Sequence, residues 1–88
     1  MTASQRQRLH QLLLVGLKSD TTGRGFSAAV IAMHARTELD PELSEDQVTS
    51  ELRTLADQRL VAPLTTALSG TRWIITEQGR QALAEAGL

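Results

Sequence analysis

Residues 44–61 read SEDQVTSELRTLADQRLV, and this stretch contains the start of a helix. Ser44 and Gln47 have the Ser-x-x-Gln spacing of a capping box, in which each side chain binds the backbone N–H of the other residue. Two acids behind the cap, Glu45 and Asp46, suit the positive end of a helix dipole. We therefore predict that a helix begins after Ser44.

The apolar residues of the same stretch recur at helical spacing. Val48, Leu52 and Leu55 fall on one face, and the stripe ends at Leu60. The polar residues are expected on the more exposed side: Gln47, Thr49, Ser50, Glu51, Arg53 and Thr54. The helix should thus bury one face and leave the other free.

A β-hairpin and a closing helix are predicted to follow. Residues 60–66 have the pattern of a strand, and Pro63 makes it an edge strand or puts a bulge there, because proline cannot donate to a ladder. Residues 67–70 form the hairpin loop. The return strand, 71–76, places Trp73 and Ile75 on the core face and the following residues on the other: Arg72, Ile74 and Thr76. Thr76 then caps a short helix over 77–86, with Ala82 and Leu83 pointing inward.

Two further helices are predicted before Ser44. Ser4 and Gln7 form a second capping-box pattern, which starts a helix whose buried face holds Leu9, Leu12, Leu13, Gly16 and Leu17. Leu14 and Val15 fall on the flanks of that face and widen it. Residues 19–25 contain two glycines and form a loop, with or without a short strand.

Ser27 is expected to cap the second of these helices, 28–36. Val30 and Met33, with Ala29 and Phe26 alongside, should meet the first helix. Residues 38–43, which include Pro41, end it. The predicted fold class is therefore α+β: three helices, a β-hairpin and a short C-terminal helix in a single domain over residues 1–88.

The second half of the chain resembles the winged helix-turn-helix family of small bacterial and phage transcriptional regulators, of the multiple-antibiotic-resistance and arsenical-resistance repressor types. Residues 48–61, VTSELRTLADQRLV, resemble the family's recognition helix running into its first wing strand. Residues 72–80, RWIITEQGR, resemble the second wing strand and the turn that opens the last helix. The chain departs from the pattern at Gln58 and Arg59, where a glycine usually closes the recognition helix.

The resemblance implies a DNA-binding transcriptional regulator. In such proteins the third helix enters the major groove of double-stranded DNA and the hairpin, or wing, touches the adjacent backbone. The candidate DNA-binding residues are then Gln47, Thr49, Ser50, Arg53 and Thr54 on the helix, with Arg72 on the wing. Glutamine can pair with adenine and arginine with guanine, while hydroxyl groups mostly bind phosphates.

The charge distribution favours a second interpretation of the function. Residues 37–60 hold seven acids against Arg53 and Arg59, whereas phosphate neutralisation needs bases. The wing tip, Ala67-Leu68-Ser69-Gly70, is uncharged. The alternative is a winged helix protein–protein interaction module of the kind that phages encode, with an interface at Leu14, Leu68 and Ile74.

The composition restricts the class of protein, its compartment and the kinds of site that we expect. The net charge is -1, apolar residues make up 41% and charged residues 22%, values of an ordinary globular protein, and no apolar run could span a membrane. The absence of cysteine fits the cytoplasm. His10 and His34 lie far apart, and Gly23-Arg24-Gly25 is too short for a phosphate loop, so we expect no enzyme, no metal and no cofactor. A homodimer is expected because the apolar stripe of the first helix is wide.

Overall fold

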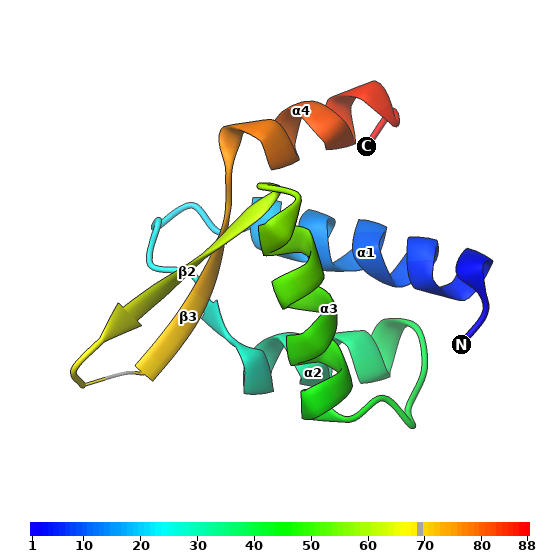
Figure 1. The fold of residues 1–88 in the computed structure, drawn as a ribbon, viewed down its shortest axis with the longest axis horizontal. Helices are drawn as coiled ribbons and strands as arrows, with labels where there is room; N and C mark the ends of the chain where they lie inside the picture. Colours follow the sequence, from blue (N-terminus) through cyan, green and yellow to red (C-terminus); the bar gives the residue numbers. More distant parts are fainter. Residues whose placement is uncertain (69) are drawn as a thin grey trace.

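The computed structural model describes residues 1–68 and 70–88, and this part of the chain forms four helices and three strands (Figure 1). In chain order they are α1 (Ala3–Lys18), β1 (Phe26–Ser27), α2 (Ala28–Glu38), α3 (Glu45–Asp57), β2 (Val61–Thr66), β3 (Gly70–Ile75) and α4 (Glu77–Glu85). The predicted α+β winged helix order is confirmed. In the described residues, no helix has both the length and the apolar character needed to cross a membrane.

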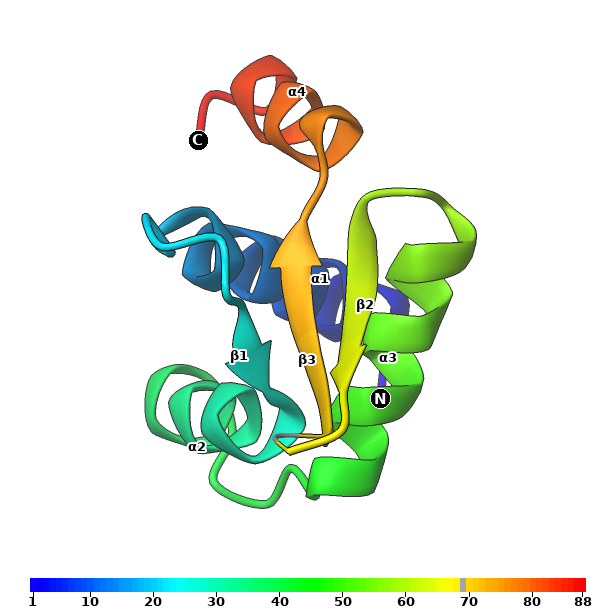
Figure 2. The same ribbon diagram turned by 90° about the vertical axis from the view of Figure 1, so that its left-hand side faces the viewer.

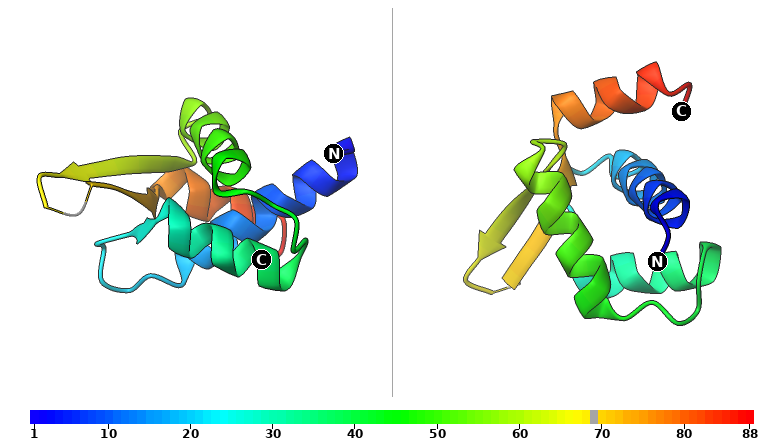
Figure 3. Two further views of the ribbon diagram at one scale, coloured as in Figure 1. Left: turned by 90° about the horizontal axis from the view of Figure 1, so that it is seen from below. Right: turned by 45° about the vertical axis from the view of Figure 1, so that its right-hand side comes forward.

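The strands form one antiparallel sheet in the order β1-β3-β2. Trp73 of β3 pairs with Phe26 on one side and with Pro63 on the other. Strand β2 lies at the edge, which is one of the two alternatives that Pro63 predicts. The hairpin of β2 and β3 projects beyond the helices (Figures 1 and 3), and in Figure 2 the sheet lies in front of α1.

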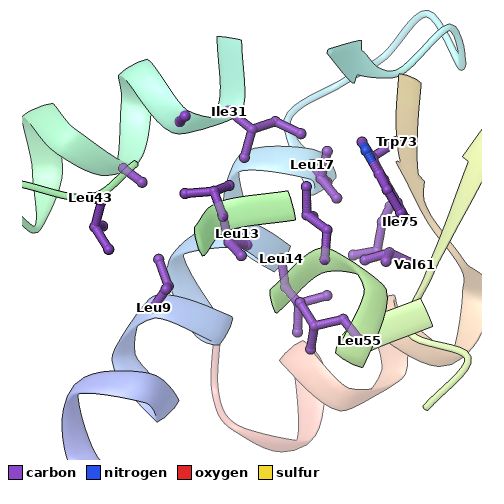
Figure 4. Close-up of a cluster of buried hydrophobic side chains, with 14 of the residues drawn as sticks. Leu9, Leu13, Leu14, Leu17, Ile31, Leu43, Leu55, Val61, Trp73 and Ile75 are labelled. Atoms are coloured by element: carbon purple, nitrogen blue, oxygen red, sulfur yellow. The ribbon is translucent and has the colours of Figure 1, made fainter. Parts of the chain in front are cut away.

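The core lies between α1, α2, α3, α4 and the inner face of the sheet (Figure 4). Trp73 and Ile75 of β3 are buried there with Val61 of β2, as the strand alternation predicts. The helices contribute the leucines and small residues of the core: Leu9, Leu13, Leu14, Leu17, Ile31, Ala32, Ala35, Val48, Leu52, Leu55 and Leu83. Trp73 is therefore a core residue.

Side-chain caps begin α2, α3 and α4 where the sequence predicts them. The hydroxyl groups of Ser27, Ser44 and Thr76 each accept a backbone N–H of the first helical turn. The predicted start of α1 is wrong: Thr2, with Gln5, forms the capping box, in place of Ser4 with Gln7. Both pairs have the same spacing, and the earlier pair adds residues to the helix and so backbone hydrogen bonds.

The predicted inward face of α2 is also wrong. Val30 and Met33 are 50% and 64% exposed, and the buried residues are Ile31, Ala32 and Ala35. Alanines have short side chains, so this face allows α2 to approach its neighbours more closely than Val30 and Met33 would. The larger apolar side chains of α2 are left at the surface.

Helix α1 is buried on two sides, because it lies between α2 and α4 (Figure 3, right). Leu14, on one flank of the predicted face, is 5% exposed and belongs to the core. Val15, the other flanking residue, is 42% exposed. The wide apolar stripe of α1 is thus explained mainly by packing inside the molecule. The prediction of Leu14 as an interface residue is wrong.

Candidate nucleic-acid interface

Helix α3 presents one face to the core and the opposite face to solvent. Val48, Leu52 and Leu55 are buried, as predicted. Ser50 and Asp57 lie on the far side of the helix, at the successive 100° turns of an α-helix from the buried stripe. The helix stands beside the projecting hairpin, so that both elements are accessible together (Figure 1).

The predicted DNA-contact residues of α3 divide between exposed and half-buried positions. Gln47, Ser50 and Arg53 are exposed, whereas Thr49 and Thr54 are half-buried. The hydroxyl of Thr54 donates to the carbonyl of Ser50 at 3.2 Å, one turn earlier in the helix. The side-chain oxygen of Gln47 accepts the N–H of Ser44 at 2.8 Å as part of the cap. Gln47 thus has only its amide NH₂ group left for a partner.

Arg53 is the only basic residue in the sequence of α3. Its side chain is exposed, and it forms no ion pair with another residue of 1–68 or 70–88. It lies between the solvent-facing side of the helix and the flank opposite Glu51. A guanidinium group in this position is free to donate two hydrogen bonds to a guanine or a phosphate.

Arg72 lies in the middle strand of the sheet. It pairs with Ser27 of β1 and with Leu64 of β2, and it alternates with the buried Trp73, so it belongs to the sheet face turned away from α1 (Figure 2). The residue is half-buried, and its Nε atom is buried without a hydrogen-bond partner in the described part of the chain. Arg72 is therefore set back from the tip of the hairpin and separate from the α3 candidates.

Glu51 is predicted to be exposed, and this is wrong. Its carboxylate accepts a hydrogen bond from Arg6 Nε at 2.9 Å and is also paired with His10 Nε2, both from α1. Only 15% of the Glu51 side chain is exposed. Burial by itself raises the pKa of Glu51, but the hydrogen bonds from His10 and Arg6, with the charge of Arg6, outweigh it and lower the pKa below 4.5.

This cluster changes the charge balance of α3. The carboxylate of Glu51 faces α1, where Arg6 balances its negative charge. The negative charge that remains on the helix lies at its ends, with Glu45 and Asp46 in the first turn and Asp57 in the last. The middle of the exposed face holds Ser50 and Arg53. Sequence reasoning missed the cluster because Arg6 and His10 are far from Glu51 in the chain.

The residues predicted for a protein interface are not brought together. Leu14 is in the core, Leu68 is fully exposed at the hairpin tip, and Ile74 is half-buried. The loop before β1 covers part of Ile74, because a Cβ atom on Gly25 would lie 3.0 Å from Ile74 Cγ2. Ser69, which has the one polar side chain of the predicted wing tip, lies outside the described residues.

The basic residues of the first 36 positions are dispersed. Arg6 lies beside α3 through Glu51, and Arg36 donates from Nε to the carbonyl of Leu43 at 2.5 Å, just before α3. Lys18 instead donates to the carbonyl of Leu88 at the other end of the chain, and Arg24 is exposed in the loop before β1. Within the described residues no group of three or more His, Cys, Asp or Glu side chains is arranged to hold a metal.

Comparisons with known proteins give a structural match. No family model matches the sequence, and no curated protein matches it. The fold is similar to the ferric uptake regulator Fur of Helicobacter pylori, whose structure is described as revealing three functional metal-binding sites: the TM-score is 0.67 and the identity 24% over 85% of this chain. This chain covers 45% of that protein. The chain thus has an α+β winged helix fold that is also found in a known regulator.

Proposed function

We propose that this chain is a small DNA-binding transcriptional regulator that places α3 in the major groove of double-stranded DNA and rests its hairpin on the adjacent backbone. The observation that carries the proposal is the pairing of Glu51 with α1, which leaves Arg53 as the charged group at the middle of the exposed face of α3. The structural similarity to a regulator supports the same class.

The roles of the individual residues follow from their positions. Arg53 reads a base edge or binds a phosphate, and the Ser50 hydroxyl and the Gln47 NH₂ group bind beside it. Thr49 and Thr54 are half-buried and contact DNA through their outer edges. Arg72, which is half-buried, binds a backbone phosphate from the sheet through the terminal nitrogens of its guanidinium group, since its Nε atom is buried.

We propose that the regulator is of the multiple-antibiotic-resistance or arsenical-resistance repressor type, which the motifs at 48–61 and 72–80 favour. We propose further that residues 1–88 form one domain, that the protein acts in the cytoplasm, and that it is a homodimer. The exposed apolar side chains of Val15, Val30 and Met33 support the last point.

The experiment is a fluorescence anisotropy titration of the protein against random-sequence duplex DNA at about 50 mM and about 200 mM salt. Binding should weaken steeply with salt because phosphate contacts release counterions. Arg53→Ala should reduce the affinity by about 1–3 kcal/mol. Arg80→Ala, which removes an equally exposed arginine from α4, serves as the matched control and should bind like the wild type.

The results separate cleanly. If the wild type fails to bind at low salt, or if Arg53→Ala and Arg80→Ala lose the same affinity, α3 does not contact DNA as proposed. If binding depends on Arg53, sequencing the retained duplexes identifies the preferred site. The same titration with Arg72→Ala tests the sheet contact and should reduce the salt slope by about one.

A further inference from the structure

Large apolar side chains are exposed on both α1 and α2. Val15 of α1 is 42% exposed, and Val30 and Met33 of α2 are 50% and 64% exposed. Val30 and Met33 are three residues apart, so they lie on the same face of α2. Leu12, half-buried in α1, lies between Val15 and Val30. Exposed apolar surface with a polar rim is typical of a protein–protein contact.

Two adjoining grooves give this surface its shape, and Leu12 lines both. The first runs between α1, β1 and α2, is lined by Leu12, Gly16, Phe26, Val30 and His34 among others, and encloses about 180 Å³. The side chain of His34 forms a wall above Gly16, since a Cβ atom there would be 3.5 Å from His34 Cδ2. A cavity of about 150 Å³ is enough to hold a benzene molecule, so the first groove can take one large apolar side chain.

The second groove carries opposite charges at its rim. Arg8 of α1 and Glu38 of α2 both line it, together with Leu12, Val15 and Leu39. Neither charge takes part in an ion pair with another described residue. In a dimer with two-fold symmetry, a residue i of one copy that contacts residue j of the other is matched by j of the first contacting i of the second. A surface that carries one base and one acid can therefore be complementary to itself.

We propose that the surface formed by Leu12, Val15, Val30 and Met33 is the interface between two copies of this chain, with Arg8 of each copy facing Glu38 of the other. Met33, a flexible and exposed side chain, then enters the first groove of the second copy. The two-fold arrangement forms the Arg8–Glu38 contact twice. This proposal rests on the homodimer proposed above and specifies its surface.

The interface leaves the candidate DNA-binding residues free. Neither groove is lined by a residue of α3, β2 or β3. Dimerisation and DNA binding can therefore be disturbed one at a time. A standard interface buries about 800 Å² per partner, which is about a seventh of the 5639 Å² that the chain exposes.

The test is a charge reversal followed by sedimentation equilibrium over a range of protein concentrations. Arg8→Glu and Glu38→Arg should each weaken the dimer by about tenfold or more, because each creates two like-charge contacts. The double variant, with both reversals, should recover the wild-type dimer affinity. Met33→Glu should dissociate the dimer, whereas Leu68→Glu, at the fully exposed hairpin tip, should leave it intact. Circular dichroism checks that every variant is folded.

Three results would overturn this interface: a wild type that stays monomeric up to millimolar concentration, a dimer that is insensitive to Met33→Glu, or a double reversal that fails to restore the dimer. Titration of a short duplex with the Met33→Glu variant keeps the two proposals apart. A monomeric variant that binds the duplex like the wild type supports both proposals. If Met33→Glu dissociates the dimer but the wild type does not bind DNA, the interface is supported and the regulator proposal is overturned.

Discussion

The hydroxyl of Thr76 donates a 2.6 Å hydrogen bond to the main-chain carbonyl of Arg59 and accepts one of 3.1 Å from the N–H of Gly79. One side chain thus caps α4 and satisfies a carbonyl just beyond α3. The backbone N–H of Thr76 also donates to the carbonyl of Leu60 at 3.1 Å. The segment that follows α3 is therefore fastened to the start of α4, which fixes where the hairpin leaves the helices.

Replacement of Thr76 should test this junction directly. Thr76→Val keeps the shape of the side chain and removes both hydroxyl hydrogen bonds, so the free energy of unfolding should fall by about 1–2 kcal/mol in urea titrations. Thr76→Ser should retain most of the stability. Thr21→Val, at an exposed loop position, is the control and should change the stability by less than about 0.5 kcal/mol. Equal stability of Thr76→Val and the wild type would contradict the role of the hydroxyl.

Two helical glycines should respond in opposite ways to alanine. A Cβ atom on Gly79 would collide with the carbonyl oxygen of Leu60, a backbone atom that cannot move aside. Gly79→Ala should therefore lower the melting temperature strongly, with a loss of about 2 kcal/mol or more. A Cβ atom on Gly16 would be in ordinary contact with His34, so Gly16→Ala should stabilise α1 by up to about 1 kcal/mol. Destabilisation by both changes would refute the packing described at Gly16.

Arg59 has a φ of 63°, in the left-handed region that disfavours side chains. It is one of the two residues, with Gln58, at which the sequence departs from the glycine of the winged helix pattern. Arg59→Gly should relieve the strain and raise the free energy of unfolding by about 0.5–1 kcal/mol. The control is Arg53→Gly inside α3, which should lower it by about 1 kcal/mol. Thermal melts of both variants measure these changes. A loss of stability in Arg59→Gly would show that the side chain of Arg59 contributes more to stability than the strained backbone costs.

The Glu51 cluster should make stability depend on acid pH. The pKa of Glu51 is lower in the folded protein than its ordinary value of 4.5, so its contribution is present above that pH and is lost as the pH falls through the folded pKa. At neutral pH, Glu51→Gln should cost about 1 kcal/mol, since Arg6 is half exposed and solvent weakens its pairing. The difference from the wild type should shrink below pH 4.5 in urea titrations.

Glu85→Gln removes an exposed glutamate at the end of α4 that has no ion pair among the described residues, and it serves as the control. It should track the wild type over the whole pH range. A constant difference between Glu51→Gln and the wild type at every pH would mean that the carboxylate charge does not contribute to the stability of the α1–α3 contact.

Local chemistry made much of the fold predictable. Ser44 and Thr76 begin helices because their hydroxyl groups satisfy N–H groups only three residues away, and Pro63 marks an edge strand by a property of its own backbone. The start of α1 was mistaken because Thr2 and Ser4 have equivalent local partners. The buried side of α2 was mistaken because hydrophobicity favours Val30 and Met33, while close packing favours alanine.

The candidate site was less predictable for a different reason. The exposure of Arg53 follows from the helical spacing of α3. The withdrawal of Glu51 does not, because it requires α1 to lie across α3 with Arg6 and His10 in reach. Leu14 likewise gives no local sign that it is buried in the core. Contacts between distant segments therefore determine which of the polar and apolar residues remain available to a partner.

The short strand β1 joins the two halves of the sequence. Phe26 and Ser27 pair with Trp73 and Arg72, so the connection between α1 and α2 is part of the same sheet as the hairpin. The helices of the first half and the hairpin of the second half consequently share one core and cannot unfold separately. Unfolding should proceed as one cooperative event, in which the slowest-exchanging amide hydrogens of α1 and those of β3 are released with the same opening free energy.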